Sequence, residues 1–149
     1  MDAPQSRVMA KRVVLTTLFC SNNIFKHISL EKCMKICHVN MFYLPAVGGV
    51  EQVIYELAKR QVRDGHEVHV YCCDSDKNKR ITLKEEIIEG VHVHRLPYLA
   101  RLSLSTFIWP SLLWRFPKGF DIVHTHVSGH LYISIIGLLS RIRKLKHFT

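Results

Sequence analysis

The stretch from Lys35 to Gly65 constrains the fold more than any other part of the chain. It contains a short apolar run, KICHVN, a loop that ends in Gly48–Gly49, an amphipathic segment and a closing glycine, after which the apolar run HEVHVYCC begins. A strand, a glycine turn, a helix and a second strand in this order predict a βαβ unit. We therefore expect an α/β fold with a Rossmann-like parallel sheet and helices on both faces.

The remaining segments repeat this plan. Apolar residues at helical spacing predict the first helix over 50–64, with Gly65 as its stop. Further strands are predicted over 67–72, 91–95, 121–125 and 147–149, with a helix over 130–141, while 81–89 fits either an edge strand or a helical turn. Because the fifth strand begins where the sequence stops, we expect a fragment or a separate half of a larger protein.

Strand order would bring two distant loops together. In the common doubly wound order 3-2-1-4-5, the strands at 35–40 and 121–125 are neighbours, and right-handed crossovers send their helices to opposite faces. The loops after these strands then open a crevice at the carboxyl edge of the sheet, where ligands bind. We therefore predict that Gly48, Gly49 and His126 line one pocket.

The chemistry of these three residues suits an anionic or hydroxylated ligand. Glycines let a ligand approach the backbone, and the free N–H groups at a helix start favour phosphate. Histidine can bond a sugar hydroxyl or handle a proton near neutral pH. Simpler explanations stay open, because a glycine pair can be only a turn and a histidine at a strand end can be merely packed or solvated.

Other site signatures are weak or missing. His92 and His94 share one face of a strand, as do His124 and His126, but no carboxylate stands at ligand spacing, so we predict no metal site. The sequence has no G-x-S-x-G, no P-loop and no full G-x-G-x-x-G. Hydrolase, NTPase and dinucleotide-binding functions therefore lack their signatures.

Composition favours a folded domain with an anionic partner. The 149 residues are 48% hydrophobic and 22% charged, as in ordinary globular proteins, and the formal net charge is +9. Such a charge suits nucleic acid, a phosphorylated substrate or an acidic membrane surface, but the scattered basic residues argue against nucleic acid. We expect the five cysteines to be reduced, as in a cytoplasmic protein.

Residues 1–33 are interpreted as a leader outside the folded domain at 34–149. Their apolar run Val13–Cys20 follows basic residues and faintly resembles a signal peptide, but no small-residue cleavage site follows it. A disordered leader and a true start at Met34 are the alternatives that we favour. No run reaches the roughly 18 apolar residues that a membrane-spanning helix needs.

Aromatic and basic residues are mixed in the segment Tyr98–Lys118. This mixture suits the surface of an anionic membrane. A helix that packs on the sheet or on a missing domain explains the same pattern, and we favour this explanation. The residues that we predict at a membrane interface are Trp109, Trp114, Arg101, Arg115 and Lys118.

Four segments together resemble the N-terminal domain of family 4 glycosyltransferases. They are KICHVN, LPAVGGVEQVIYELAKRQVRDGHEVHVYC, EGVHVHRLP and FDIVHTHVSGH, and they occur in the family's order. In that family a GGVE-type loop opens the first helix and a D-[IV]-[IV]-H-x-H motif ends the fourth strand. The resemblance covers residues 34–149 and leaves out residues 1–33.

The resemblance implies the N-terminal half of a GT-B architecture, in which two Rossmann-like domains face a common cleft. Such enzymes transfer a hexose from a nucleotide sugar to an acceptor with retention, without a catalytic metal or another cofactor. Gly48 and Gly49 match the glycine loop beside the donor phosphates and the acceptor. Glu51 matches the acidic position after it, for which a role in the first helical turn is an equal explanation. His126 matches the histidine that reaches the donor sugar, and it is the predicted catalytic residue.

The family's C-terminal domain, with its E-x7-E motif, has no counterpart in the sequence. We therefore expect this chain alone to be inactive and to need a donor domain or a partner chain. The expected acceptor is a sugar or a lipid-linked molecule, and the expected location is the cytoplasm, with a peripheral site on an anionic membrane. Two alternatives stay open: a non-catalytic membrane- or partner-binding half of a two-subunit glycosyltransferase, and a dinucleotide-binding oxidoreductase domain.

Overall fold

The computed structural model describes residues 32–103, 107–115, 119–126 and 131–149. Met34–Thr149 forms one compact unit, whereas the expectations for residues 1–31 lie outside the described ranges. The elements are β1 (Lys35–Val39), α2 (Gly49–Arg63), β2 (Glu67–Cys73), β3 (Glu85–Ile88), β4 (Val91–Leu96), β5 (Ala100–Arg101), β6 (Phe107–Ile108), α3 (Ser111–Arg115), β7 (Ile122–Thr125), α4 (Leu131–Ile142) and β8 (Lys146–Phe148). None of the described helices is long and apolar enough to cross a membrane.

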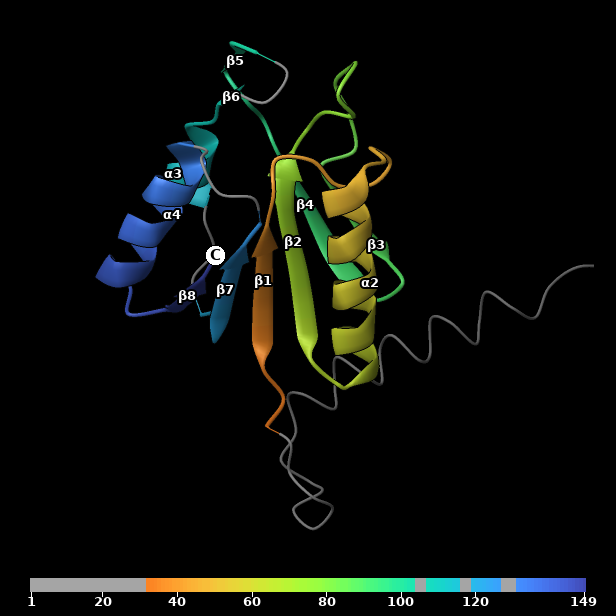
Figure 1. Ribbon diagram of the computed structural model, residues 1–149, viewed down its shortest axis with the longest axis vertical. Coiled ribbons are helices and arrows are strands. Elements are labelled where there is room, and N and C mark those ends of the chain that lie inside the picture. The colour runs from red at the N-terminus through yellow and green to blue at the C-terminus, as the bar shows by residue number, and fades with distance from the viewer. Residues whose placement is uncertain (1–31, 104–106, 116–118, 127–130) are drawn as a thin grey trace, which may run out of the picture. The chain divides into compact units, whose positions relative to one another are not determined.

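The central sheet has the order β3-β4-β2-β1-β7-β8 (Figure 1). Its strands are parallel except β3, which pairs antiparallel with β4 at one edge. The predicted Rossmann-like fold class is confirmed, as is the neighbourhood of the first and fourth parallel strands, β1 and β7. The ambiguous segment 81–89 supplies the antiparallel edge strand.

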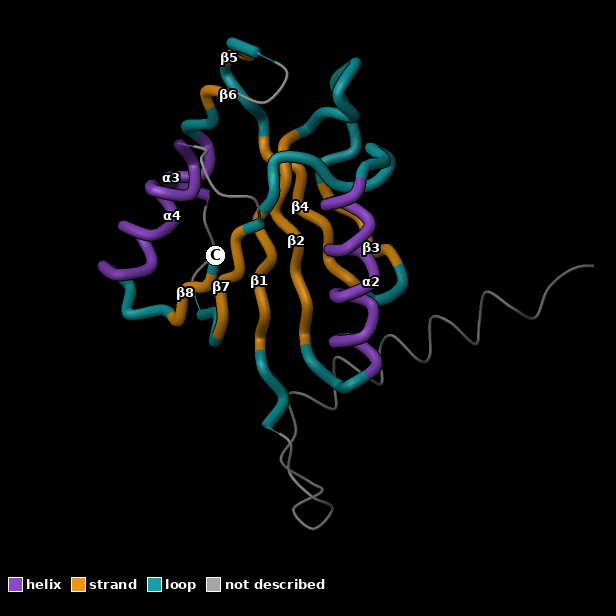
Figure 2. Tube along the Cα trace, viewed as in Figure 1, coloured by secondary structure: helices purple, strands orange, loops and turns teal. Residues whose placement is uncertain are grey.

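Helix α2 covers one face of the sheet, where it packs on β2 and β4 (Figure 2). Its buried side chains Ile54 and Ala58 repeat at helical spacing and meet the apolar residues that β2 and β4 turn toward it. Glu51 in the first turn and Arg63 in the last turn match the helix dipole. Gly65 follows at φ +89°, a left-handed conformation in which glycine is favoured.

Helices α3 and α4 belong to the other face, and their core is larger. It joins Cys37, Val39 and Val123 from the strands to Leu112 of α3 and Ile136 of α4. Alternate residues of β1 therefore serve different faces, which places His38 on the α2 side of the sheet. The face on which a β1 side chain lies therefore determines whether it can reach the carboxyl edge of the sheet on the α2 side, as His38 does.

The cysteines differ in oxidation state. Cys37, Cys72 and Cys73 are buried free thiols that fill the core on both faces of the sheet. Cys33 is disulfide-bonded, so the prediction that all cysteines are reduced is wrong for that residue. Sequence spacing alone does not determine disulfide pairing, because pairing depends on the distance and direction between side chains.

Candidate functional site

The carboxyl ends of β1 and β7 form the candidate site. The two strands pair in register from Ile36 with Ile122 to Val39 with Thr125, so His38 stands beside His124. The chain leaves β7 at His126, whose N–H donates to the Val39 carbonyl at 3.1 Å. The β1–α2 loop and the first residue after β7 therefore leave the sheet at the same edge.

An ion pair between the buried Glu51 and the partly exposed Lys77 holds the end of the β1–α2 loop. Gly48 is the N-cap of α2, and Glu51, only 6% exposed, folds its carboxylate back beneath it. The Lys77 Nζ lies 3.3 Å from Glu51 Oε1 and donates to the Val47 carbonyl at 3.1 Å. A β-carbon at Gly48 would overlap Glu51 Oε2, whereas a β-carbon at Gly49 would meet nothing within 4 Å. The two glycines thus have different roles, and only Gly48 permits a close approach.

His126 is held by a hydrogen-bond relay that runs through His38 of β1 to Gln61 of α2. Its Nε2 lies 3.0 Å from His38 Nδ1, and His38 Nε2 lies 2.7 Å from Gln61 Oε1. An amide oxygen only accepts, so His38 Nε2 carries the proton and His38 Nδ1 is an acceptor. His126 must then donate from Nε2, which leaves a lone pair on its Nδ1. The relay therefore holds His126 in the tautomer that carries its proton on Nε2.

Burial keeps this histidine group neutral. Burial, together with the neighbouring His124 and His38, lowers the pKa of His126 to about 3. Burial also lowers the pKa of His38 to about 4, although the Gln61 hydrogen bond opposes the change. At neutral pH His126 is therefore a neutral hydrogen-bonding group and not a cation.

The predicted site residues are held by two different sets of contacts. His126 contacts His38, which in turn bonds Gln61, whereas Gly48 lies against Glu51 and Lys77 at the end of the β1–α2 loop. The common pocket of Gly48, Gly49 and His126 stays a prediction. His38, Gln61 and Lys77 were missed, yet a histidine inside the apolar run of β1 was a signal that its side chain needs a polar partner.

The predicted membrane residues separate into buried and exposed groups. Trp109 is 5% exposed and packs against Tyr132 of α4, so its ring lies in the core and not at the surface. Trp114 is 70% exposed at the end of α3, beside the exposed Arg115. Arg101 is half-buried and donates to the Lys77 carbonyl. Lys118 lies outside the described residues.

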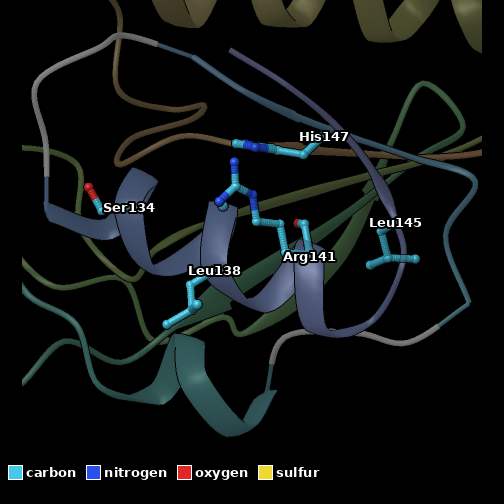
Figure 3. Close-up of a pocket in the computed structure, with 7 residues that line it drawn as sticks. Ser134, Leu138, Arg141, Leu145 and His147 are labelled. Atoms are coloured by element: carbon cyan, nitrogen blue, oxygen red, sulfur yellow. The ribbon is translucent and has the colours of Figure 1, made fainter.

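A separate pocket of about 550 Å³ lies between α4 and β8 (Figure 3). It is lined by Ser134, Leu138, Arg141 and His147 among others. His147 pairs in register with Val123, whose side chain belongs to the α3–α4 core. The pocket therefore opens on the opposite side of the sheet from His38 and is not part of the candidate site.

The sheet order and the loops at its carboxyl edge define an α/β domain of the class that binds ligands at a switch point between neighbouring strands. A family model described as Glycosyltransferase Family 4 matches residues 47–147. The chain belongs to this family, and its domain is that of a transferase with a Rossmann-like fold of the GT-B type. No individual curated protein and no solved structure matches the chain.

Proposed function

We propose that the chain is the acceptor-side half of a retaining hexosyltransferase, which passes a hexose from a nucleotide sugar to a sugar or lipid-linked acceptor. The observation that carries the proposal is the relay Gln61–His38–His126 at the carboxyl edge. It leaves the His126 Nδ1 lone pair ready to accept a hydrogen bond from a hydroxyl group of the hexose.

A neutral hydrogen-bond acceptor at His126 suits the chemistry of glycosyl transfer. Positive charge develops on the sugar ring as the bond to the leaving group breaks, giving an oxocarbenium-like transition state. A protonated imidazole beside that ring would repel the developing charge, whereas neutral His126 would not. The free N–H groups of the first turn of α2 favour the donor phosphates, with Lys77 offsetting the charge of Glu51.

The nucleotide-binding half is proposed to come from a second domain or partner chain. In the described residues the candidate site offers backbone and histidine groups at one sheet edge, which would form one wall of the cleft between the two halves. The proposal requires no cofactor for transfer, with the nucleotide sugar acting as substrate. The proposed location is the cytoplasm.

Thermal unfolding in the presence of nucleotide sugars tests the proposal. We expect one class of nucleotide sugar to raise the melting temperature of the chain, and to raise it more when a polypeptide that carries an E-x7-E domain is added, because ligand binding to the folded state stabilises it. NAD is expected to have no effect. Stabilisation by NAD alone would contradict the transferase proposal and favour the oxidoreductase alternative.

The two glycines supply matched variants for the same measurement. Gly48→Ala displaces the Glu51 carboxylate and the Lys77 ammonium, so we expect affinity for the nucleotide sugar to fall about tenfold or more. Gly49→Ala has room for its methyl group and is expected to bind normally. His126→Ala should also weaken binding of the hexose. Equal affinities for all three variants would show that the ligand binds elsewhere.

We also propose that residues 99–103 and 107–115 contact an anionic membrane. Large apolar side chains stand exposed there next to basic ones, which suits an interface with acidic lipids. The exposed apolar residues are Leu99, Leu102, Ile108, Leu113 and Trp114. The buried Trp109 is left out of this surface.

Flotation with vesicles of phosphatidylserine and phosphatidylcholine measures this contact. Trp114→Ala is expected to weaken vesicle binding about tenfold, because the indole loses apolar area that the lipid would bury. Leu138→Ala, which removes another exposed apolar side chain on α4, is the control and should bind as the unmodified chain does. Unchanged flotation of the Trp114 variant would remove the membrane proposal.

A further inference from the structure

The three histidines at the carboxyl ends of β1 and β7 form a cluster with the geometry of metal ligands. His38 and His124 lie side by side in register, and His126 follows two residues after His124. One ring nitrogen from each lies within 4.8 Å of the others, and the closest pair, His38 Nδ1 and His126 Nε2, is 3.0 Å apart. A tetrahedral ion with bonds of about 2.0 to 2.1 Å needs nitrogens about 3.4 Å apart, so the closest pair must separate slightly and a pair near the 4.8 Å limit must approach.

The surroundings of the cluster also suit a metal. A metal-bound imidazole usually donates its second ring N–H to an oxygen acceptor, which sets the tautomer and the ring orientation. His38 already donates Nε2–H to Gln61 Oε1 at 2.7 Å, so its Nδ1 lone pair faces the cluster. His124 is partly exposed, which gives an ion access from solvent.

We propose that His38, His124 and His126 bind one transition-metal ion of the zinc class, with an open fourth position. Imidazole ligands suit Zn²⁺, Co²⁺, Ni²⁺ and Cu²⁺ and do not suit Mg²⁺. This site shares His126 with the proposed transfer site, for which the family resemblance implies no metal, so an ion bound here would take away the Nδ1 lone pair that the proposed function uses. Binding would move the His126 proton from Nε2 to Nδ1, because Nε2 then holds the ion. The ion would thereby reverse the tautomer of the metal-free protein.

A second histidine group in the chain provides a comparison. His69 Nδ1 lies 2.9 Å from His94 Nε2, and His69 Nε2 lies 2.8 Å from Glu67 Oε1. No third ligand atom completes a cluster there among the described residues, so His94→Asn should not change metal binding.

Titration of the metal-free 149-residue chain with Co²⁺ tests the proposal. We expect one equivalent to bind, with the strong visible absorption of tetrahedral Co²⁺, and Zn²⁺ to displace it. His124→Asn removes the most exposed ligand and should abolish this absorption, while His94→Asn should keep it. Gln61→Leu should weaken binding roughly 10-fold to 100-fold, as loss of a supporting hydrogen bond does elsewhere.

Nitrogen-15 NMR of labelled histidines supplies a second readout. Zn²⁺ is expected to convert His126 from the Nε2–H to the Nδ1–H form, and Mg²⁺ at the same concentration is expected to leave it unchanged. The inference would be overturned by octahedral Co²⁺ absorption, by binding that His124→Asn leaves intact, or by an unchanged His126 tautomer. These readouts do not involve sugar transfer, so they separate failure of the metal site from failure of the proposed function.

Discussion

The Glu86→Gln variant is expected to lose about 3 to 5 kcal/mol of the free energy of unfolding, because it leaves a buried guanidinium without its counter-charge. Arg95 is 3% exposed in β4, and its Nη2 contacts Glu86 on the neighbouring strand β3. The same Nη2 donates to the Leu44 carbonyl at 2.6 Å. Nε and Nη1 of Arg95 have no hydrogen-bond partner among the described residues, so the Glu86 carboxylate provides most of the compensation.

Urea unfolding of two neighbouring variants measures this effect. Glu85→Gln changes the adjacent carboxylate, whose side chain is 79% exposed, and its expected change in unfolding free energy is within about 0.5 kcal/mol. Comparable losses for Glu85→Gln and Glu86→Gln would show that general charge, and not the buried pair, determines the effect.

The ion pair of Arg95 also matters for the candidate site. Leu44 belongs to the loop that leads from β1 to Gly48, and its carbonyl is held by Arg95. At the far end of the loop, Lys77 holds the Val47 carbonyl. Two cations from separate parts of the chain therefore fix the loop from both ends. We expect Glu86→Gln to loosen the glycine loop as well as to lower stability.

The backbone arrangement was largely predictable from the sequence. Apolar periodicity located the first helix to within a residue at each end, because the side chains that meet the sheet must repeat at helical spacing. The common doubly wound strand order 3-2-1-4-5 then placed β1 beside β7, and with it His126 beside the end of β1. These features follow from local pattern and chain connectivity, which are both present in the sequence.

The side-chain contacts of the site were not predictable in the same way. The contact of His38 with Gln61 depends on where α2 crosses β1, and its contact with His126 depends on strand register. The burial of Trp109 was missed because aromatic and basic residues have the same composition in a packed segment and in a membrane surface. A hairpin, β5–β6, and the short helix α3 turn Trp109 inward and Trp114 outward.

Acidification from pH 6.5 to pH 4 is expected to destabilise the chain strongly, because buried imidazoles must take up protons when they ionise. Burial lowers the pKa of His38 and of His69 to about 4, compared with about 6.5 in the unfolded chain. Between these values the folded state binds fewer protons than the unfolded state, so stability falls as the pH falls. Above about pH 6.5 the contribution is complete. The contribution of fully buried His38 is on the order of 3 kcal/mol.

His69 allows the linkage to be measured away from the candidate site. Glu67 bonds its Nε2 and opposes the decrease in pKa, while His92, His94 and Lys35 add to the decrease that burial causes. Burial has the largest effect, because the ring lies in the sheet against Phe120. The pKa of His69 therefore stays below that of an exposed histidine despite its carboxylate partner.

The His69→Gln variant is expected to lose stability less steeply with acid than the unmodified chain. Removing one linked proton lowers the slope of unfolding free energy against pH by up to about 1.4 kcal/mol per pH unit between pH 6.5 and 4. Urea unfolding at several pH values, with a chelator present, gives this slope. Val62→Ala, which truncates an apolar contact between α2 and the sheet, should lower stability at every pH without changing the slope. A slope that His69→Gln leaves unchanged would show that His69 titrates alike in the folded and unfolded chain, and that its burial does not contribute to acid sensitivity.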